Sequence, residues 1–289
     1  MDVLLTNDDG IDATGIGVLA EALSEIADVT VVAPAEDQSA VGRTLSRTVT
    51  VTERASDTDP WSAYAVSGTP ADCTVAGLYS LCPETDLVVA GCNRGANLSA
   101  YTLGRSGTVS AAVEATFFDV PAIAVSLYIP GDYDFEAIAT RESAYAEAAR
   151  ATTHLAEHVA NGATDGGVFD QADYLNVNAP LPEASGLHES GETGTTEPDE
   201  SEAGGEGSGA AMVVTHPSCV CDMDAVREGD SITIRDRIWA RMADDDIPDD
   251  PGSDRRTVMN GDVSVSPLTA PHTTERHDAL DALAAEYPA

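Results

Sequence analysis

Short runs of apolar residues alternate with segments of helical periodicity over the first 180 residues of the chain. The apolar runs are bounded by Pro or by turn residues, which is typical of buried strands. We expect strands at 1–6, 29–33, 61–66, 86–90, 121–127 and 174–177. We expect helices between them at 15–26, 72–81, 106–118 and 141–161. The first of these helices has one apolar face, made by Ile16, Leu19, Ala20, Leu23 and Ile26.

This alternation predicts the fold class. Strands that alternate with helices form a parallel sheet covered on both faces, so we expect a three-layer, Rossmann-like α/β fold. Ligands in such folds bind beyond the carboxyl ends of the strands. The informative loops are therefore those after Thr6, Ala33, Val66 and Ala90.

The pattern changes after about residue 180. Residues 183–209 are rich in Gly, Ser, Thr and Glu and carry eight acidic residues with no Lys or Arg, which predicts a flexible loop. Asp244–Asp254 is a second acidic stretch. Strand-like segments lie between and after these two stretches, at 212–215, 231–234 and 263–265, and a helix is expected at 275–286. Alternating residues in the last two strands predict antiparallel pairing with one face in solvent.

We therefore expect three parts: an α/β core at 1–182, an acidic flexible loop at 183–210, and a C-terminal part at 211–289. The C-terminal part contains strands, the second acidic loop and the helix.

The charge balance is extreme, with 50 acidic and 14 basic residues and a net charge of −36. All of the basic residues are Arg. Disorder is the alternative for such a chain, but the regular apolar segments contradict it. A folded protein with this surface repels itself in dilute buffer, and salt relieves the repulsion because the Debye length is only about 3 Å at 1 M. The composition resembles that of proteins from extreme halophiles, and we expect a requirement for molar salt. It also disfavours nucleic-acid polymers as partners.

The cysteine pattern and the N-terminus bear on the compartment. The five cysteines include no CxxC pair, and Cys219-Val-Cys221 has the wrong spacing for a zinc knuckle. We interpret them as small apolar residues in a reducing compartment. No run of 18 apolar residues is present, and Met1 is not followed by a basic and apolar leader. We therefore expect a cytoplasmic protein without a membrane span.

The loop after the first strand carries adjacent carboxylates, Asp8 and Asp9. Two such groups repel each other unless a positive charge lies between them, and a divalent cation prefers carboxylate oxygens. A helix cap is the alternative, because Asp is favoured at helix starts. This loop alone does not decide between a metal site and a cap.

Three further loops carry polar groups at expected strand ends. Ser39 offers a neutral oxygen, and Arg43 offers a fork suited to phosphate. Asn93 and Asn97 lie in a Gly-containing loop after the Val-rich strand, where amides can bind a metal or phosphate. Ser106-Gly107-Thr108 opens a helix, where free N–H groups and hydroxyls form an anion site. Ordinary loops and simple capping are the alternatives.

Together these loops resemble one family, the SurE survival-protein nucleotidases. The matching strings are LLTNDDGIDATGI at 4–16, VVAP at 31–34, QSAVGRTLS at 38–46, SGTPADC at 67–73, DLVVAGCNRGANLS at 86–99 and RSGTVSAAVEA at 105–115. Further matches are PAIAVS at 121–126, YLNVNAP at 174–180 and GDVSVSPL at 261–268.

The resemblance implies a phosphatase that releases phosphate from nucleoside 5'- and 3'-monophosphates with one divalent cation per subunit, Mg²⁺, Mn²⁺ or a similar ion. It implies the metal ligands Asp8, Asp9, Ser39 and Asn93, and the phosphate-facing residues Asn97, Ser106, Gly107 and Thr108. In the family, a C-terminal hairpin and helix exchange between subunits, which implies a homodimer or homotetramer here.

The chain departs from the family at Arg105, where many members have Tyr, and at Ser99, where many have Gly. Arg105, like Arg43, is a candidate for contacts with the phosphate or base. The expected reaction is metal-assisted hydrolysis, with Asp8 or Asp9 as a candidate base for the attacking water. Two alternatives are an aspartyl-phosphate intermediate on Asp8 or Asp9 and a non-catalytic nucleotide-binding or regulatory protein that keeps the pocket.

Overall fold

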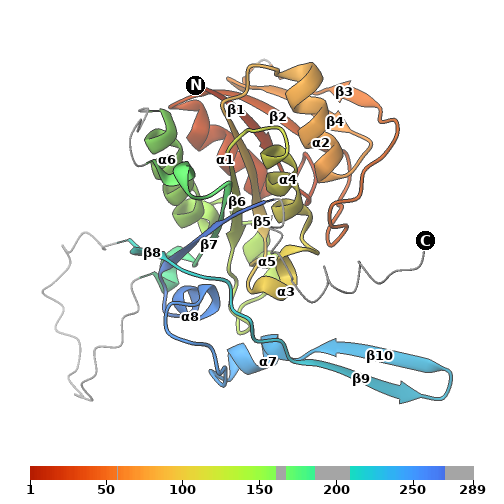
Figure 1. Ribbon diagram of the computed structural model, residues 1–289, viewed down its shortest axis with the longest axis vertical. Helices are drawn as coiled ribbons and strands as arrows, with labels where there is room; N and C mark the ends of the chain where they lie inside the picture. Colours follow the sequence, from red (N-terminus) through yellow and green to blue (C-terminus); the bar gives the residue numbers. More distant parts are fainter. Residues whose placement is uncertain (57, 161–166, 186–208, 271–289) are drawn as a thin grey trace, which may run out of the picture.

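The protein is built on one large sheet with helices on both faces, as shown in Figure 1. The computed structural model describes residues 1–56, 58–160, 167–185 and 209–270. The strands of the large sheet are β1 (Asp2–Thr6), β2 (Asp28–Pro34), β3 (Val51–Glu53), β4 (Ser62–Val66), β5 (Leu87–Arg94), β6 (Ala122–Leu127), β7 (Tyr174–Ala179), β8 (Met212–Val214) and β11 (Val263–Leu268).

The strand order is β3-β4-β2-β1-β5-β6-β7-β11-β8. The six strands from β4 to β7 are parallel, β3 and β11 join them in antiparallel pairing, and β8 is parallel to β11. The chain proceeds from β1 to β2 on one side and later returns to β5 on the other side of β1. This reversal between β1 and β5 is the topological switch point at which open α/β sheets bind ligands. The predicted fold class is confirmed.

Four helices form the two outer layers: α1 (Thr14–Ser24), α2 (Pro70–Ala76), α4 (Gly107–Thr116) and α6 (Ala146–Ala160). Alternate side chains of β1 pack against different helix layers. Val3 and Leu5 belong to the apolar cluster that includes α1 and α6, whereas Leu4 belongs to the cluster that includes α4. The apolar face predicted for α1 is buried up to Leu23, and the helix ends at Ser24, before Ile26.

The helix predicted at 72–81 begins earlier, at Pro70 as α2, and its second half, Gly77–Leu81, is a π-helical turn. The predicted helix at 141–161 begins with a 3₁₀ turn at Glu142–Tyr145 before α6. Two more 3₁₀ turns lie at Val168–Asp170 and Pro182–Ala184. No helix in the described part of the chain is long and apolar enough to cross a membrane.

Four short helices were not predicted from the sequence: α3 (Ala100–Leu103), α5 (Phe135–Ala139), α7 (Ile238–Ala243) and α8 (Asp254–Met259). None is longer than six residues, so none produces the repeated apolar spacing on which a helix prediction depends. Two strands, β3 and β9 (Met223–Glu228), were also missed.

The C-terminal part separates into two kinds of structure. β8 and β11 complete the large sheet, while β9 pairs with β10 (Ser231–Asp236) in a two-stranded ribbon that extends away from the body (Figure 1). The prediction that the strands at 231–234 and 263–265 each have one face in solvent is wrong for both, β10 and β11. Residues 263–266 of β11 are buried because α6 and α8 pack against this strand and β7 and β8 flank it. All six residues of β10 are exposed because no second layer from the described residues covers the ribbon. The helix expected at 275–286 and most of the acidic loop at 183–210 lie outside the described residues.

Candidate active site

A cavity of about 500 Å³ opens at the carboxyl ends of the central strands, next to the switch point. It brings together residues that are far apart in the sequence. The predicted site residues that line it are Asp8, Ser39, Asn93, Asn97, Arg105 and Ser106. Three of the four predicted metal ligands therefore share one cavity, and the fourth, Asp9, lines the adjoining one.

Asp8 is fixed in this cavity from two sides. Its backbone carbonyl accepts a hydrogen bond of 2.7 Å from the N–H of Gln38, which ties the loop after β1 to the loop after β2. The hydroxyl of Thr108, at the start of α4, donates to the Asp8 carboxylate. Thr108 is fully buried and is absent from the cavity lining. Its side chain therefore orients Asp8 in this structure.

Gly107 lies where α4 approaches Asp8 most closely. A Cβ atom at this position would lie 2.7 Å from the Cβ of Asp8 and 2.8 Å from its Oδ2. A methyl group does not fit at that distance, so the close approach of helix and carboxylate requires glycine. The Ser-Gly-Thr sequence thus combines a cap, a residue without a side chain and a hydrogen-bond donor to Asp8.

Asp9 has a different partner. Its Oδ2 accepts from the backbone N–H of Arg94 and its Oδ1 from the guanidinium Nε, both at 2.9 Å. The same guanidinium also pairs with Asp37, and Asp37 accepts the N–H of Ser39 at 2.8 Å. Arg94 thus links the loops after β1, β2 and β5 through charged groups, and it compensates two of the carboxylates at this edge of the sheet.

Burial dominates the electrostatics of the acidic pair. It raises the pKa of Asp9 to about 6, although hydrogen bonds from Arg94 act in the opposite direction. Burial also raises the pKa of Asp8, opposed by hydrogen bonds from Thr108. Both carboxylates are therefore harder to ionise than exposed ones, and a nearby cation would favour their charged forms.

The oxygen donors suit a hard divalent cation. Asp8, Ser39 and Asn93 present a carboxylate, a hydroxyl and an amide oxygen to one cavity. The amide nitrogen of Asn93 donates to the carbonyl of Gly95, so its oxygen is the atom that would serve a metal. Among the described residues, no group of three or more His, Cys, Asp or Glu is arranged to bind a metal ion. The predicted set does not require one, because only two of its four members are of these types.

Asn97 is clamped by side chains that the sequence analysis did not single out. Asn178 accepts the backbone N–H of Asn97 at 2.8 Å and donates to its carbonyl at 3.2 Å. Asn176 donates to the same carbonyl at 2.9 Å, and the Asn97 amide donates to Ser126. A signal was present in the sequence: two asparagines at alternate positions of an otherwise apolar buried strand need polar partners on one face.

Of the remaining residues predicted to contact phosphate, two line the cavity and one does not. Ser106 caps α4 by accepting the N–H of Val109, and it also lines the cavity. Arg105 lines the cavity too, with its guanidinium 3.7 Å from the centre of the Tyr101 ring. Arg43 is not part of this lining, because it pairs with Glu114 at 2.8 Å and covers the ring of Phe117.

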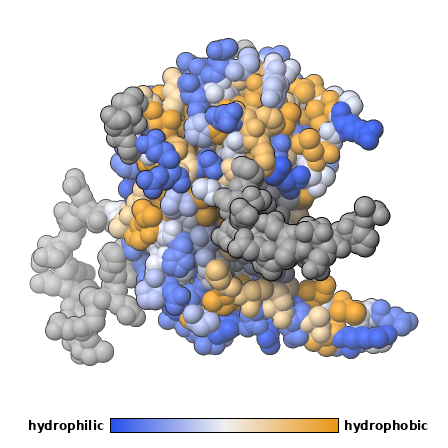
Figure 2. All heavy atoms as spheres, in the orientation of Figure 1, coloured by the Kyte–Doolittle hydropathy of each residue, from blue (hydrophilic) through white to orange (hydrophobic). Residues whose placement is uncertain are grey.

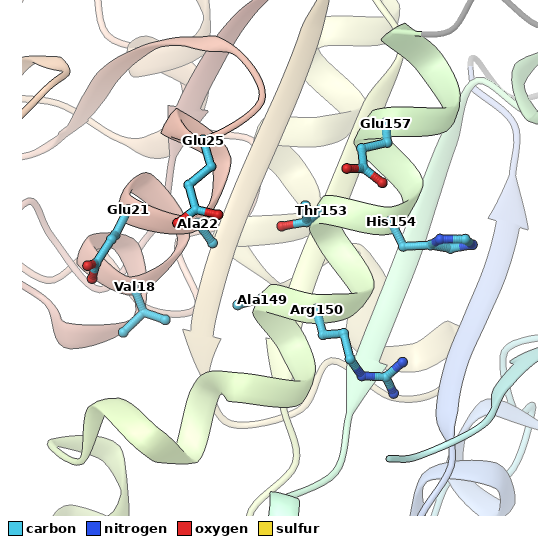
Figure 3. Close-up of a pocket in the computed structure, with 9 residues that line it drawn as sticks. All are labelled: Val18, Glu21, Ala22, Glu25, Ala149, Arg150, Thr153, His154 and Glu157. Atoms are coloured by element: carbon cyan, nitrogen blue, oxygen red, sulfur yellow. The ribbon is translucent and has the colours of Figure 1, made fainter. Parts of the chain in front are cut away.

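A second cavity, of about 530 Å³, lies between α1 and α6 (Figure 3). Its charged and titratable lining residues are Glu21, Glu25, Arg150, His154 and Glu157. His154 points away from α1 in Figure 3, as expected for a solvated side chain. This groove is formed by the outer helices and contains none of the predicted site residues, so we do not assign the chemistry to it.

Comparisons with known proteins agree with the geometry. Residues 3–199 match the family described as Survival protein SurE. The chain is 56% identical over 287 residues to the 5'-nucleotidase SurE of Haloarcula marismortui, covering 99% of this chain and 94% of that protein. It is 54% identical over 288 residues to the 5'-nucleotidase SurE of Natronomonas pharaonis, covering 99% and 100%. The crystal structure of the SurE protein from Aquifex aeolicus is similar with a TM-score of 0.63 and 29% identity over 93% of each chain. Given the family match over more than half of its length and these near full-length relatives, the chain belongs to the SurE survival-protein family.

Proposed function

We propose that this protein is a metal-dependent phosphatase that hydrolyses nucleoside 5'-monophosphates, and also 3'-monophosphates, to nucleoside and phosphate. The observation that carries the proposal is the single cavity at the switch point, which combines Asp8, Ser39 and Asn93 with Asn97 and Ser106. Oxygen donors for a cation and hydrogen-bond donors for phosphate thus share one space. The names of the near full-length relatives, 5'-nucleotidase SurE, support the same reaction.

One divalent cation per subunit, Mg²⁺, Mn²⁺ or a similar ion, would be bound by Asp8, Asp9, Ser39 and Asn93. Such an ion would supply positive charge to the phosphoryl oxygens and lower the pKa of water. Asp9 would join this set from its position beside Arg94, whose guanidinium already compensates its charge.

The other residues would bind and orient the phosphate. Ser106 accepts the N–H of Val109, so its hydroxyl proton is available to donate to a phosphate oxygen. Asn97 and Arg105 add an amide and a guanidinium at the same cavity. Gly107 and Thr108 would act by keeping Asp8 in place. Asp8 or Asp9 remains the candidate base for the water.

A phosphate-release assay tests the proposal. AMP, GMP and a chromogenic phosphoester are incubated with the protein in molar KCl, with and without Mn²⁺ or Mg²⁺. We expect release only with metal. Absence of release from all three substrates would contradict the proposal, and AMP binding without release would favour a regulatory nucleotide-binding protein. Trapping of a phospho-aspartate would instead favour a covalent route through Asp8 or Asp9.

The charge of the molecule supports adaptation to high salt. With a net charge of −36, the folded chain repels itself, and screening weakens that repulsion. We expect thermal unfolding to shift to much lower temperature in dilute buffer than in multimolar KCl, as measured by circular dichroism. Equal resistance to unfolding in the two solutions would contradict a requirement for salt.

The exposed ribbon supports a homodimer or homotetramer in which residues 211–289 contribute to the contact between subunits. Ile232 and Ile234 on β10 are 62% and 71% exposed. Figure 2 shows apolar surface along the ribbon between its hydrophilic tip and the body. Light scattering coupled to size exclusion tests this proposal, and a monomer at all concentrations would contradict it. A cytoplasmic location is supported by the five free cysteines, two of which are exposed.

A further inference from the structure

Three aromatic side chains gather at the cavity of the candidate active site. Tyr101, Phe135 and Trp239 line it and are 37%, 41% and 45% exposed. They come from three different short helices, α3, α5 and α7, which lie at the end of the sheet that faces the ribbon in Figure 1. Aromatic residues make up only 5% of the chain, so three at one cavity are a local concentration.

The other exposed aromatic rings among the described residues, Phe117 and Tyr79, each contact a partner side chain. Phe117 is covered by the guanidinium of Arg43 at 4.3 Å, and Tyr79 packs edge-on against Phe118 with the ring centres 5.2 Å apart. Tyr101 has such a partner on one face, Arg105. Within the described residues, Phe135 and Trp239 have no ring or cation against them. Exposed rings without partners at the mouth of a binding cavity are typical of ligand contacts.

Trp239 is fixed relative to the phosphate side of the cavity. Its neighbours on α7, Ile238 and Met242, are buried in one apolar cluster with Ala96 and Leu98. Ala96 and Leu98 flank Asn97, so α7 packs directly on the loop that presents a phosphate donor. The distance between the aromatic wall and the phosphate subsite is therefore set by packed side chains.

We propose that Phe135 and Trp239 form a subsite that binds the nucleobase of the substrate by stacking. The subsite lies in the same cavity as Asp8, Asn97 and Ser106, so one nucleotide can contact both ends. Stacking accepts any base because every base has an aromatic face. The inference rests on the proposed phosphatase function and specifies which part of the substrate the aromatic wall recognises.

The kinetic test compares a substrate with a base and one without. The ratio of kcat/KM for AMP to kcat/KM for ribose 5-phosphate is measured for the full chain with Mn²⁺ in molar KCl. We expect Trp239→Ala and Phe135→Ala each to lower this ratio on the order of 10-fold, because alanine removes the stacking surface. Tyr79→Ala is the matched control, since this exposed ring lies outside the cavity, and it keeps the ratio. An equal loss for both substrates would overturn the subsite.

A binding test does not depend on turnover. The chain has two tryptophans, so in a Trp61→Phe protein Trp239 is the single reporter of fluorescence. We expect adenosine, in the presence of Mg²⁺ and molar KCl, to change the Trp239 emission in a saturable way, and ribose to leave it unchanged. No response to adenosine would overturn the subsite. Saturable binding by a protein that releases no phosphate would instead refute the proposed function alone.

Discussion

The large sheet and the β9–β10 ribbon are both regular β structure, but they are buried to opposite degrees. Every residue of β6 and of β7 is buried, and every residue of β10 is exposed. The central strands of the sheet have neighbouring strands at both edges and helices on both faces, whereas within the described residues the ribbon pairs only its own two strands. A two-stranded ribbon is marginal in water by itself. The sheet is therefore stabilised by its own chain, whereas comparable burial of the ribbon would require a partner.

The same contrast divides the candidate active site. The carboxylates and amides come from loops anchored in the buried sheet, and they are fixed by hydrogen bonds such as those of Asp9 and Asn97. The aromatic wall is completed by Trp239, just after the ribbon. We infer that the sheet supplies the chemistry and that the segment after the ribbon supplies recognition of the base.

The largest expected effect is on kcat, from a substitution in the loops anchored in the sheet. Asp9→Asn should lower kcat by at least roughly 10³-fold, because it removes a charged metal ligand worth several kcal/mol. The fold should survive, since the asparagine oxygen can still accept the N–H of Arg94. Phosphate release and a thermal unfolding curve measure the two properties. Asp12→Asn is the matched control, because the Asp12 side chain is 80% exposed. An Asp9→Asn protein with full activity would refute the assignment of this ligand.

The next prediction compares the stability of the two regions directly. Leu4→Ala should lower the free energy of unfolding by about 3 kcal/mol, because it leaves a cavity in the sheet. Ile234→Ala should change it by less than about 0.5 kcal/mol in dilute protein, because that side chain is 71% exposed. Guanidinium chloride titrations at low and high protein concentration measure both.

A partner that covers the ribbon would make the cost of Ile234→Ala grow with protein concentration. A large cost at every concentration would instead show that the ribbon packs on its own chain, and the contrast between the two regions would then be wrong.

How much of this was predictable differs between the two regions for a physical reason. The strands of the sheet are predictable from long apolar runs. The placement of Asp8, Ser39 and Asn93 at one edge follows from the rule that parallel strands end at the same edge. The helices that carry Tyr101, Phe135 and Trp239 are too short to leave a periodic pattern. Thr108 shows another limit. The sequence predicts an anion site for phosphate at this helix start, whereas in the structure the hydroxyl of Thr108 donates to the carboxylate of Asp8.

A smaller effect is expected from the clamp on Asn97. Asn178→Asp keeps the acceptor for the Asn97 N–H but replaces the donor to its carbonyl by a second oxygen. Oxygen would then face oxygen, and the loop should shift. We expect kcat for AMP to fall by about 10-fold, on the order of one lost buried hydrogen bond. Asn260→Asp, which adds the same charge at an exposed position, is the control. Equal kinetics in the two variants would show that the clamp is not needed.

The smallest effect concerns Ser99, where the C-terminal segment contacts the sheet side. Its N–H donates to Asp254 of α8 at 2.7 Å, and its backbone has φ 74° and ψ 151°, a region that is essentially reserved for glycine. Ser99→Gly should therefore raise the free energy of unfolding by about 0.5–1 kcal/mol, the relief of strain exceeding the entropy gained by the unfolded chain. Ser62→Gly, in ordinary extended backbone of β4, should lower it by a similar amount. A loss in both variants would mean that contacts of the serine side chain, rather than backbone strain, determine the energy of this junction.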